Sequence, residues 1–318
     1  MKYLLTGACG FIGAYVLRAL FDEKEEVVCM DITIHTDILE KIFTQEELKR
    51  IRFVRGNVQD LAFLVDLCKK NEINSIIHLA TLLEVPSRNC SEAVKTNILG
   101  TVNIFDTARI LGMKKVVWAS SQTVFGPQGR HREEYIQNDG AHYPLTIYAA
   151  TKSFLENISR NYYEEYGLIT IGLRYSIVYG YGRPDTGGGG YAACLINRPA
   201  YGKKAIVQYG DDAPNWLYVK DAARATLLAC RTSEERIRAY TITGEIQETK
   251  KVRDYVKKII PGADIELLPG VFGSGWKFDV TQARERLGYE PSYSVQRGVR
   301  ETIRLIQKEM ERRDKDEK

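Results

Sequence analysis

The stretch Thr6-Gly7-Ala8-Cys9-Gly10-Phe11-Ile12-Gly13 decides the fold of this chain. A short apolar run, Tyr3 to Leu5, precedes it, and an amphipathic stretch from Phe11 to Phe21 follows. A glycine trio alone is common in ordinary turns, but the order of strand, glycine turn and helix is informative. In that order glycines allow a tight turn, close helix–strand packing and the approach of backbone to a diphosphate. We therefore expect the amino terminus of the helix to bind a dinucleotide.

The alternation of predicted strands and helices continues along the chain after this stretch. Short β-branched runs occur at 27–30, 53–54, 75–79, 116–119 and 170–174. Helical periodicity fills the intervals, notably over 90–111 and 147–166. Strands that alternate with helices pair in parallel through right-handed crossovers. The sequence therefore predicts an α/β fold with a doubly wound, parallel, Rossmann-type sheet.

The pattern changes after Tyr175, where a glycine-rich loop and short segments begin. We expect a dinucleotide-binding Rossmann domain over 1–177, to which 216–245 returns. The segments 178–215 and 246–318 are then expected to form a smaller C-terminal substrate lobe over the carboxyl ends of the strands, where open sheets bind ligands. The charged tail from Lys308 is expected to fray.

Composition narrows the class of protein. The net charge of +4 over 318 residues is small, and basic and acidic residues alternate, so nucleic acid is not an expected partner. No apolar run approaches the ~20 residues that span a bilayer, and strand residues begin at Lys2, so we expect no membrane or targeting segment. The six cysteines lie far apart, which indicates buried thiols, no metal site and a cytoplasmic location.

Asp31 ends the second predicted strand, where a ribose-binding carboxylate belongs. It would accept hydrogen bonds from the ribose hydroxyls and repel a 2′-phosphate, so NAD is predicted rather than NADP. The structural alternative is an aspartate that opens a turn.

Tyr148 and Lys152 stand at i and i+4, which places both on one face of the predicted helix. A tyrosine with a pKa of about 10 is a poor base at neutral pH, and a neighbouring ammonium lowers that value. Ser120 and Ser121 end the fifth predicted strand, at the same edge of the sheet. The spacing of Tyr148 and Lys152 is common on surface helices. It indicates a catalytic pair here because it follows the fifth predicted strand and its two serines.

Together these residues resemble the extended short-chain dehydrogenase/reductases, in particular the NAD-dependent epimerase/dehydratase family. The resemblance spans nearly the whole chain and is carried by 6–13, Asp31, 56–60, 78–81, 97–101, 120–126, Tyr148, Lys152, 174–175, 178–180 and 216–221. It implies Ser121, Tyr148 and Lys152 as catalytic residues. It implies cofactor contacts from Gly7, Cys9, Gly10, Phe11, Ile12, Gly13, Asp31, Ile32, Asn57, Val58, Leu79, Ala80, Thr81, Asn97, Tyr148, Lys152 and Tyr175. Substrate contacts are expected from Thr81, Ser121, Gln122, Tyr148, Ser176 and Arg183.

Three departures from the family pattern bear on the reaction. Ile177 and Ala213-Pro214-Asn215 stand where nucleotide-sugar epimerases usually carry an asparagine and an arginine. Gln122-Thr123 replaces the acidic pair of sugar-nucleotide dehydratases, which argues against dehydration. Epimerisation of a sugar or nucleotide-sugar is therefore ranked narrowly first. The alternatives are a net dehydrogenase of a small sugar, sugar acid or hydroxy acid, and a non-catalytic NAD-binding regulatory protein. The resemblance also implies a homodimer formed by helices 90–111 and 147–166.

Overall fold

The computed structural model describes residues 1–83, 90–233, 239–273 and 277–316. Within them, seven strands form the central sheet in the order β3-β2-β1-β4-β5-β6-β10, and each neighbouring pair is parallel. Their bounds are β1 (Lys2–Thr6), β2 (Glu26–Asp31), β3 (Arg52–Arg55), β4 (Ser75–His78), β5 (Lys115–Ser121), β6 (Ile169–Tyr175) and β10 (Ala239–Ile242). The predicted α/β, doubly wound fold is confirmed.

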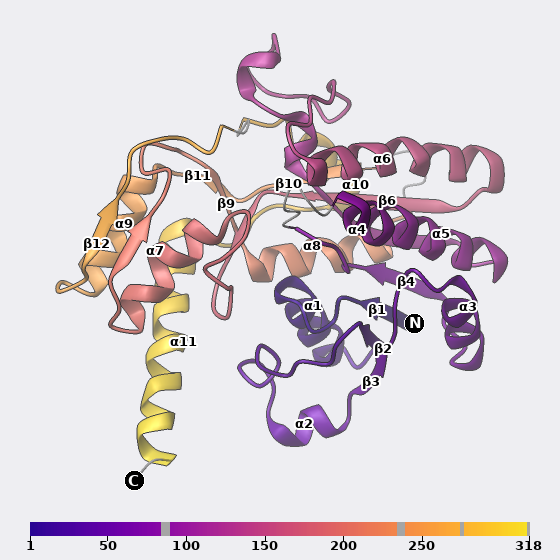
Figure 1. Cartoon of the computed structure of the whole chain (residues 1–318), viewed down its shortest axis with the longest axis horizontal. Coiled ribbons are helices and arrows are strands. Elements are labelled where there is room, and N and C mark those ends of the chain that lie inside the picture. The colour runs from indigo at the N-terminus through magenta and orange to yellow at the C-terminus, as the bar shows by residue number, and fades with distance from the viewer. Residues whose placement is uncertain (84–89, 234–238, 274–276, 317–318) are drawn as a thin grey trace.

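Helices cover both faces of this sheet (Figure 1). Helices α1 (Phe11–Asp22) and α8 (Val219–Arg231) pack against each other on one face, where Leu17 and Leu227 enter the core. Helices α3 (Leu61–Lys70), α5 (Gly100–Ile110) and α6 (Ile147–Tyr166) cover the other face through apolar residues such as Leu155. A sheet buried on both sides explains why its strands read as continuous apolar runs.

Two predicted helices have the expected extents. Helix α4 (Cys90–Ala93), a π-helical segment over Val94–Leu99 and α5 follow one another without a break. Helix α6 begins after Thr146, whose side chain accepts a hydrogen bond from the Ala149 N–H, and ends at Gly167 in the left-handed conformation. These caps place Tyr148 in the first turn of α6, beside the carboxyl edge of the sheet.

The remaining elements build the smaller lobe and its connections. In the described chain, β7 (Ile177–Tyr179), β9 (Asn215–Tyr218) and β11 (Glu245–Ile246) form one small sheet, and β8 (Ala205–Val207) pairs with β12 (Ile265–Leu267). Helices α7 (Gly190–Ala200), α9 (Thr249–Ile259) and α11 (Val295–Asp316) surround them on one side of the molecule (Figure 1). This lobe has its own apolar core, which includes Tyr179, Trp216 and Val299. Helix α2 (Gln45–Lys49), α10 (Thr281–Leu287) and 3₁₀ turns at Gln122–Phe125 and Gln128–Arg130 complete the described elements.

The chain is divided between the two parts differently from the predicted bounds. Strand β9, which overlaps the start of the returning segment 216–245, pairs with β7 in the smaller lobe, whereas β10 joins the large sheet and α8 packs on it. Helix α10, inside 246–318, packs on the large core through Ala283 and Leu287. Two apolar residues one turn apart suffice to attach so short a helix to whichever core lies beside it, and sequence does not show which.

The tail does not fray from Lys308, because α11 continues to Asp316. Glu309 is 6% exposed and accepts hydrogen bonds from Lys41, Tyr181 and Tyr201. The contact with Lys41 fastens the last helix to the loop between β2 and α2, and the two tyrosines hold it within the smaller lobe. No helix in the described residues is long and apolar enough to cross a membrane.

Candidate active site

The glycine turn lies between β1 and β4, where the order of successive strands in the sheet reverses. Gly7 has φ +71°, and a Cβ there would lie 2.6 Å from the Ala80 backbone nitrogen. A Cβ on Gly13 would lie 2.0 Å from the Gly7 carbonyl oxygen, so α1 can pack this closely only with glycine. Gly10, the N-cap of α1, is exposed and supplies no side-chain hydrogen bond. The bare helix amino terminus fits a diphosphate.

The Asp31 carboxylate is held at the end of β2. It accepts a hydrogen bond from the Cys9 N–H at 3.1 Å and another from the Ile32 N–H at 2.8 Å. The first bond ties the carboxylate to the glycine turn, so the diphosphate site and the expected ribose site form one unit. Asp31 therefore has a structural role as well as the position expected of a ribose-binding group.

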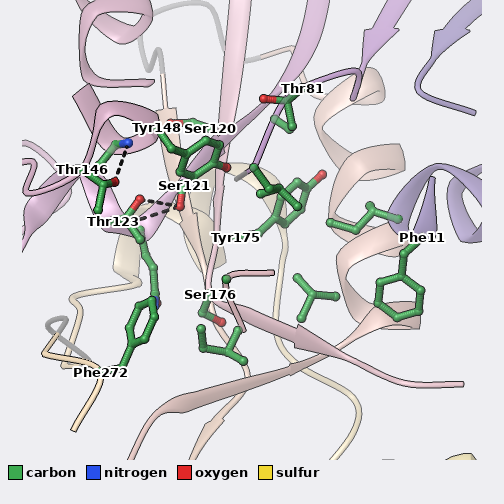
Figure 2. A pocket seen from close by; sticks show the side chains of 18 of the residues that line it. Phe11, Thr81, Ser120, Ser121, Thr123, Thr146, Tyr148, Tyr175, Ser176 and Phe272 are labelled. Carbon is green, nitrogen blue, oxygen red and sulfur yellow. Dashed lines mark hydrogen bonds between the residues drawn. The ribbon is translucent and has the colours of Figure 1, made fainter. Parts of the chain in front are cut away.

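A cavity of about 750 Å³ opens at the carboxyl edge of the sheet, against the smaller lobe (Figure 2). The predicted residues that line it are Gly7, Gly10, Phe11, Ile12, Gly13, Leu79, Thr81, Ser121, Gln122, Tyr148, Tyr175, Ser176 and Arg183. The predicted residues outside this lining are Cys9, Asp31, Ile32, Asn57, Val58, Ala80, Asn97 and Lys152. One cavity thus unites residues separated by more than half of the sequence.

Asn97 lies in the π-helical segment and is fully buried. Its amide accepts hydrogen bonds from the Thr81 hydroxyl and the Leu82 N–H and donates to the Leu82 carbonyl and the Thr151 hydroxyl. Rather than facing the cavity, Asn97 fastens the chain after β4 to helix α6. It thereby orients Thr81, which does face the cavity.

The structure distinguishes the two serines at the end of β5. The Ser120 hydroxyl donates to the buried Glu156 carboxylate. The Ser121 hydroxyl instead lies 2.9 Å from that of Thr123, beside Tyr148 in the cavity (Figure 2). Both serines line the cavity, but the Ser120 hydroxyl is bonded to Glu156, so Ser121 remains the candidate for contact with a reacting oxygen. Thr123 adds a hydroxyl that sequence reasoning had not assigned.

Burial dominates the electrostatics of the Tyr148–Lys152 pair. Lys152 is 1% exposed, and its Nζ lies 5.6 Å from the centre of the Tyr148 ring. Burial lowers the pKa of Lys152 to about 7, although the charge of Glu156 opposes this. Burial raises the pKa of Tyr148 to about 12, while a hydrogen bond with Ser121 and the charge of Arg183 act to lower it. Burial therefore disfavours both charged forms, and the predicted lowering of the Tyr148 pKa by the Lys152 ammonium is not found, since Ser121 and Arg183 are the groups that act to lower it.

Two polar side chains in the cavity wall have unused hydrogen-bonding capacity. Neither amide atom of Gln122 has a hydrogen-bond partner among the described residues, and Gln122 is 2% exposed. The Arg183 Nε is buried and likewise without a partner there, while its Nη2 donates to the Gly188 carbonyl at 2.8 Å. Unpaired buried polar atoms are costly, so these positions fit a polar ligand.

The smaller lobe contributes residues that the sequence did not indicate. Tyr209 and Phe272 line the cavity, with ring centres 5.4 Å apart. Tyr209 has φ +60°, a conformation that non-glycine residues seldom adopt. No motif surrounds either residue, so only the folded lobe brings them to the site.

Comparison with known proteins agrees with this geometry. Residues 3–242 match the NAD dependent epimerase/dehydratase family. The chain belongs to this family. It is therefore an NAD-dependent enzyme of the extended short-chain dehydrogenase/reductase type. When NAD is bound, its nicotinamide would accept a hydride from the carbon that bears the substrate hydroxyl. Within the described residues, no cluster of three or more His, Cys, Asp or Glu could hold a metal ion.

Several family members are similar along their whole length. A UDP-glucuronate 4-epimerase of Thermodesulfobacterium geofontis is 28% identical, with 97% of each chain covered. The structure of a UDP-glucuronic acid 4-epimerase of Bacillus cereus superposes with a TM-score of 0.83 at 25% identity, covering 97% of this chain and 99% of that one. A partial consensus L-threonine 3-dehydrogenase has the same fold, with a TM-score of 0.86 at 23% identity, covering 97% and 100%. The fold is thus shared by epimerases and a dehydrogenase.

The position of Asp31 predicts the choice between NAD and NADP. Replacing Asp31 with Ser removes the carboxylate that would repel a 2′-phosphate, so the ratio of NADP to NAD dissociation constants should fall by roughly tenfold or more. Isothermal titration calorimetry with both cofactors measures this ratio. A thermal melt of the variant checks that losing the contact to Cys9 leaves the protein folded. Equal affinity for NAD and NADP in the unaltered protein would contradict the assignment.

Proposed function

We propose that this enzyme epimerises a nucleotide-linked sugar at a hydroxyl-bearing carbon and that its preferred sugar is a uronate. The observation that carries the uronate is Arg183. Its guanidinium lines the same cavity as Tyr148, acts electrostatically on Tyr148, and retains a buried nitrogen without a partner among the described residues. Arginine binds a carboxylate through paired hydrogen bonds. UDP-glucuronate 4-epimerases are among the relatives that this chain matches along its whole length.

The chemical roles follow from the arrangement around the cavity. Tyr148, as the phenolate, removes the proton from the sugar hydroxyl, and Ser121 holds the same oxygen by a hydrogen bond. Lys152 stabilises the phenolate from one helical turn away. The hydride on the same carbon would pass to NAD when that cofactor is bound, which leaves a ketone. The ketone must then rotate and take the hydride back on its other face. Tyr148 then returns the proton.

Retention of the ketone distinguishes an epimerase from a net dehydrogenase with the same three residues. We assign that task to the smaller lobe. Tyr209 and Phe272 line the cavity from this lobe, and Ile177 adds an apolar wall. Ile177 and Pro214 do not replace the polar anchors usual in nucleotide-sugar epimerases, so Gln122 and Arg183 are assigned to hold the substrate.

A substrate screen tests the proposed reaction. With NAD present, UDP-glucuronate should give its 4-epimer without net accumulation of NADH, since hydride returns to the sugar. NMR of the products and absorbance at 340 nm measure these two quantities. Tyr148→Phe should lower turnover by at least about 100-fold, because the base is lost. Stoichiometric NADH from a sugar acid or hydroxy acid, with no epimer, would establish a dehydrogenase instead.

The role of Arg183 is tested by selectivity. Arg183→Met should raise the KM for UDP-glucuronate by roughly 10- to 100-fold, because a charge-assisted hydrogen bond is lost. UDP-glucose, which has no carboxylate, should be affected less. The control is Arg198→Met, which removes an exposed arginine that pairs with Asp185. An equal loss with both sugars would show that Arg183 does not recognise the carboxylate.

We also propose a two-fold symmetric homodimer. Large apolar side chains are exposed along the helical segments 90–110 and 147–166, namely Val94, Leu99, Ile110, Phe154 and Tyr166. These helices pack against each other in one chain, so a second copy would complete a four-helix contact.

The proposed dimer is tested by its mass in solution and by a substitution that should dissociate it. Sedimentation equilibrium at micromolar concentration should show twice the chain mass of 36.1 kDa. Phe154→Glu should shift the protein towards the single chain, because it places a charge in the apolar contact. Ile206→Glu changes a similarly exposed residue on β8 and should leave the dimer intact. A single-chain mass for the unaltered protein would reject the proposal.

A further inference from the structure

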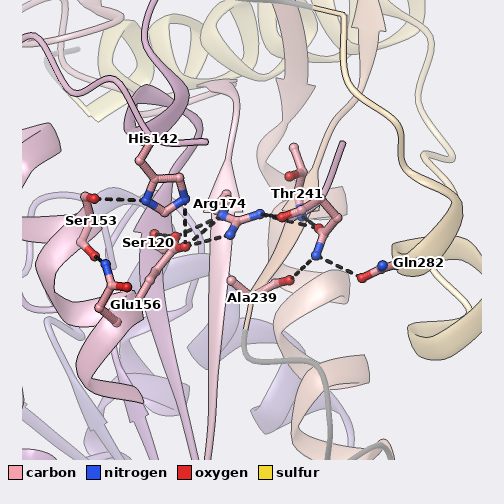
Figure 3. A network of polar contacts seen from close by, with 10 residues as sticks. Ser120, His142, Ser153, Glu156, Arg174, Ala239, Thr241 and Gln282 are labelled. Carbon is pink, nitrogen blue, oxygen red and sulfur yellow. Dashed lines mark hydrogen bonds and ion pairs between the residues drawn. The ribbon is translucent and has the colours of Figure 1, made fainter. Parts of the chain in front are cut away.

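A buried polar network surrounds Glu156, which follows Lys152 by one turn of α6 (Figure 3). At its centre the Arg174 guanidinium donates to both oxygens of Glu156, at 2.6 Å from Nη2 to Oε2 and 2.9 Å from Nε to Oε1. The Ser120 hydroxyl also donates to Glu156, and His142 Nε2 lies 3.4 Å from it. Glu156 is 7% exposed and Arg174 5%. The proposed reaction assigns no role to these groups.

The network is connected to the site through helix α6. Tyr148, Lys152 and Glu156 stand at i, i+4 and i+8, so the three side chains are stacked along one face at about 5.4 Å per turn. Lys152 is thus placed between the phenol and the carboxylate. Through Ser120, the same carboxylate contacts the residue that precedes Ser121 on β5. Both catalytic segments therefore adjoin Glu156.

The other neighbours of Lys152 contribute no negative charge. His78, from β4, is held between the Thr6 and Thr101 hydroxyls, and burial, together with the charge of Lys152, lowers its pKa to about 3, so it is neutral. The Trp118 ring, from β5, lies 5.8 Å from the Lys152 Nζ. Glu156 is the carboxylate whose charge acts on Lys152.

We propose that Glu156 is a positioning residue that keeps Lys152 protonated and in line with Tyr148, and that Arg174 holds Glu156 in place for this purpose. The bidentate contact fixes the carboxylate on the inner face of α6. Arg174 is itself held by the Asn138 carbonyl at 2.6 Å and packs over the Phe125 ring. His142 faces the same carboxylate, but burial lowers its pKa, so it adds little positive charge at neutral pH. The inference rests on the proposed roles of Tyr148 and Lys152, but not on the identity of the sugar.

The sign of the effect follows from the charges. Burial already lowers the pKa of Lys152 to about 7, and the charge of Glu156 opposes that decrease. Without it the lysine loses its proton at a lower pH, and the phenolate loses its cation. The alkaline limb of the activity profile should therefore move to lower pH. A purely structural role would reduce activity equally at every pH.

The first test titrates Lys152 directly, without substrate. In protein labelled with ¹³Cε-lysine, the Lys152 signal is identified by its loss in Lys152→Met. Its midpoint should fall by about one pH unit in Glu156→Gln. Glu156→Asp, which keeps the charge, should remain close to the unaltered protein. An unchanged midpoint in Glu156→Gln overturns the proposal, and this readout stands even if the assigned sugar is wrong.

Two further variants keep the test decisive. Glu156→Gln leaves a buried arginine unpaired and can fail to fold. If it does, the double variant Glu156→Gln/Arg174→Met removes both charges and should still lower the Lys152 midpoint. Glu309→Gln is the matched control, since it removes another buried carboxylate with a basic partner and should leave the Lys152 midpoint unchanged. In epimerase assays, the alkaline limb should shift with the Lys152 midpoint, and an unshifted limb overturns the proposal.

Discussion

The close approach of the glycine turn to two neighbours is the constraint on which the rest of the structure depends. Gly7 packs against the backbone after β4, and Gly13 packs against the Gly7 carbonyl. These contacts bring α1, β1 and β4 together at the point where the order of successive strands in the sheet reverses. They leave the amino terminus of α1 facing the cavity, and the contact from Cys9 to Asp31 extends the same unit to the end of β2. A single Cβ at Gly13 would separate the helix from the turn and so disturb every later contact.

Helix α6 converts this scaffold into a chemical site. Its first turn carries Tyr148, its second Lys152 and its third Glu156, and the last two are almost fully buried. In water such charges would interact weakly, but the apolar surroundings make each charge depend on its neighbour. The shifted pKa values of Tyr148 and Lys152 are a consequence of that burial.

The two lobes are joined by polar contacts as well as by the chain. Lys41, in the loop after β2, contacts Glu309 on α11, and the Tyr15 hydroxyl of α1 donates to the Tyr181 carbonyl. Tyr181 in turn donates to Glu309 and lies two residues before Arg183. The position of the guanidinium in the cavity is thus linked to the contact between the lobes. The smaller lobe, which lies over the edge of the Rossmann sheet, thus helps to position Arg183 in the cavity.

Local patterns determined the parallel sheet, the alternation of strands with helices and the helix that carries Tyr148 and Lys152. The glycine spacing, the alternation of apolar runs with helices and the four-residue separation of Tyr148 and Lys152 are all encoded within short segments, so sequence alone predicted them. Tertiary structure alone decided the partners of the two serines, since Ser120 donates to Glu156 whereas Ser121 lies beside Thr123. It also turned Asn97 inward, brought Tyr209 and Phe272 to the cavity, and attached α10 to the large core. These outcomes depend on contacts between residues tens to hundreds of positions apart, and a local pattern carries no record of such distances.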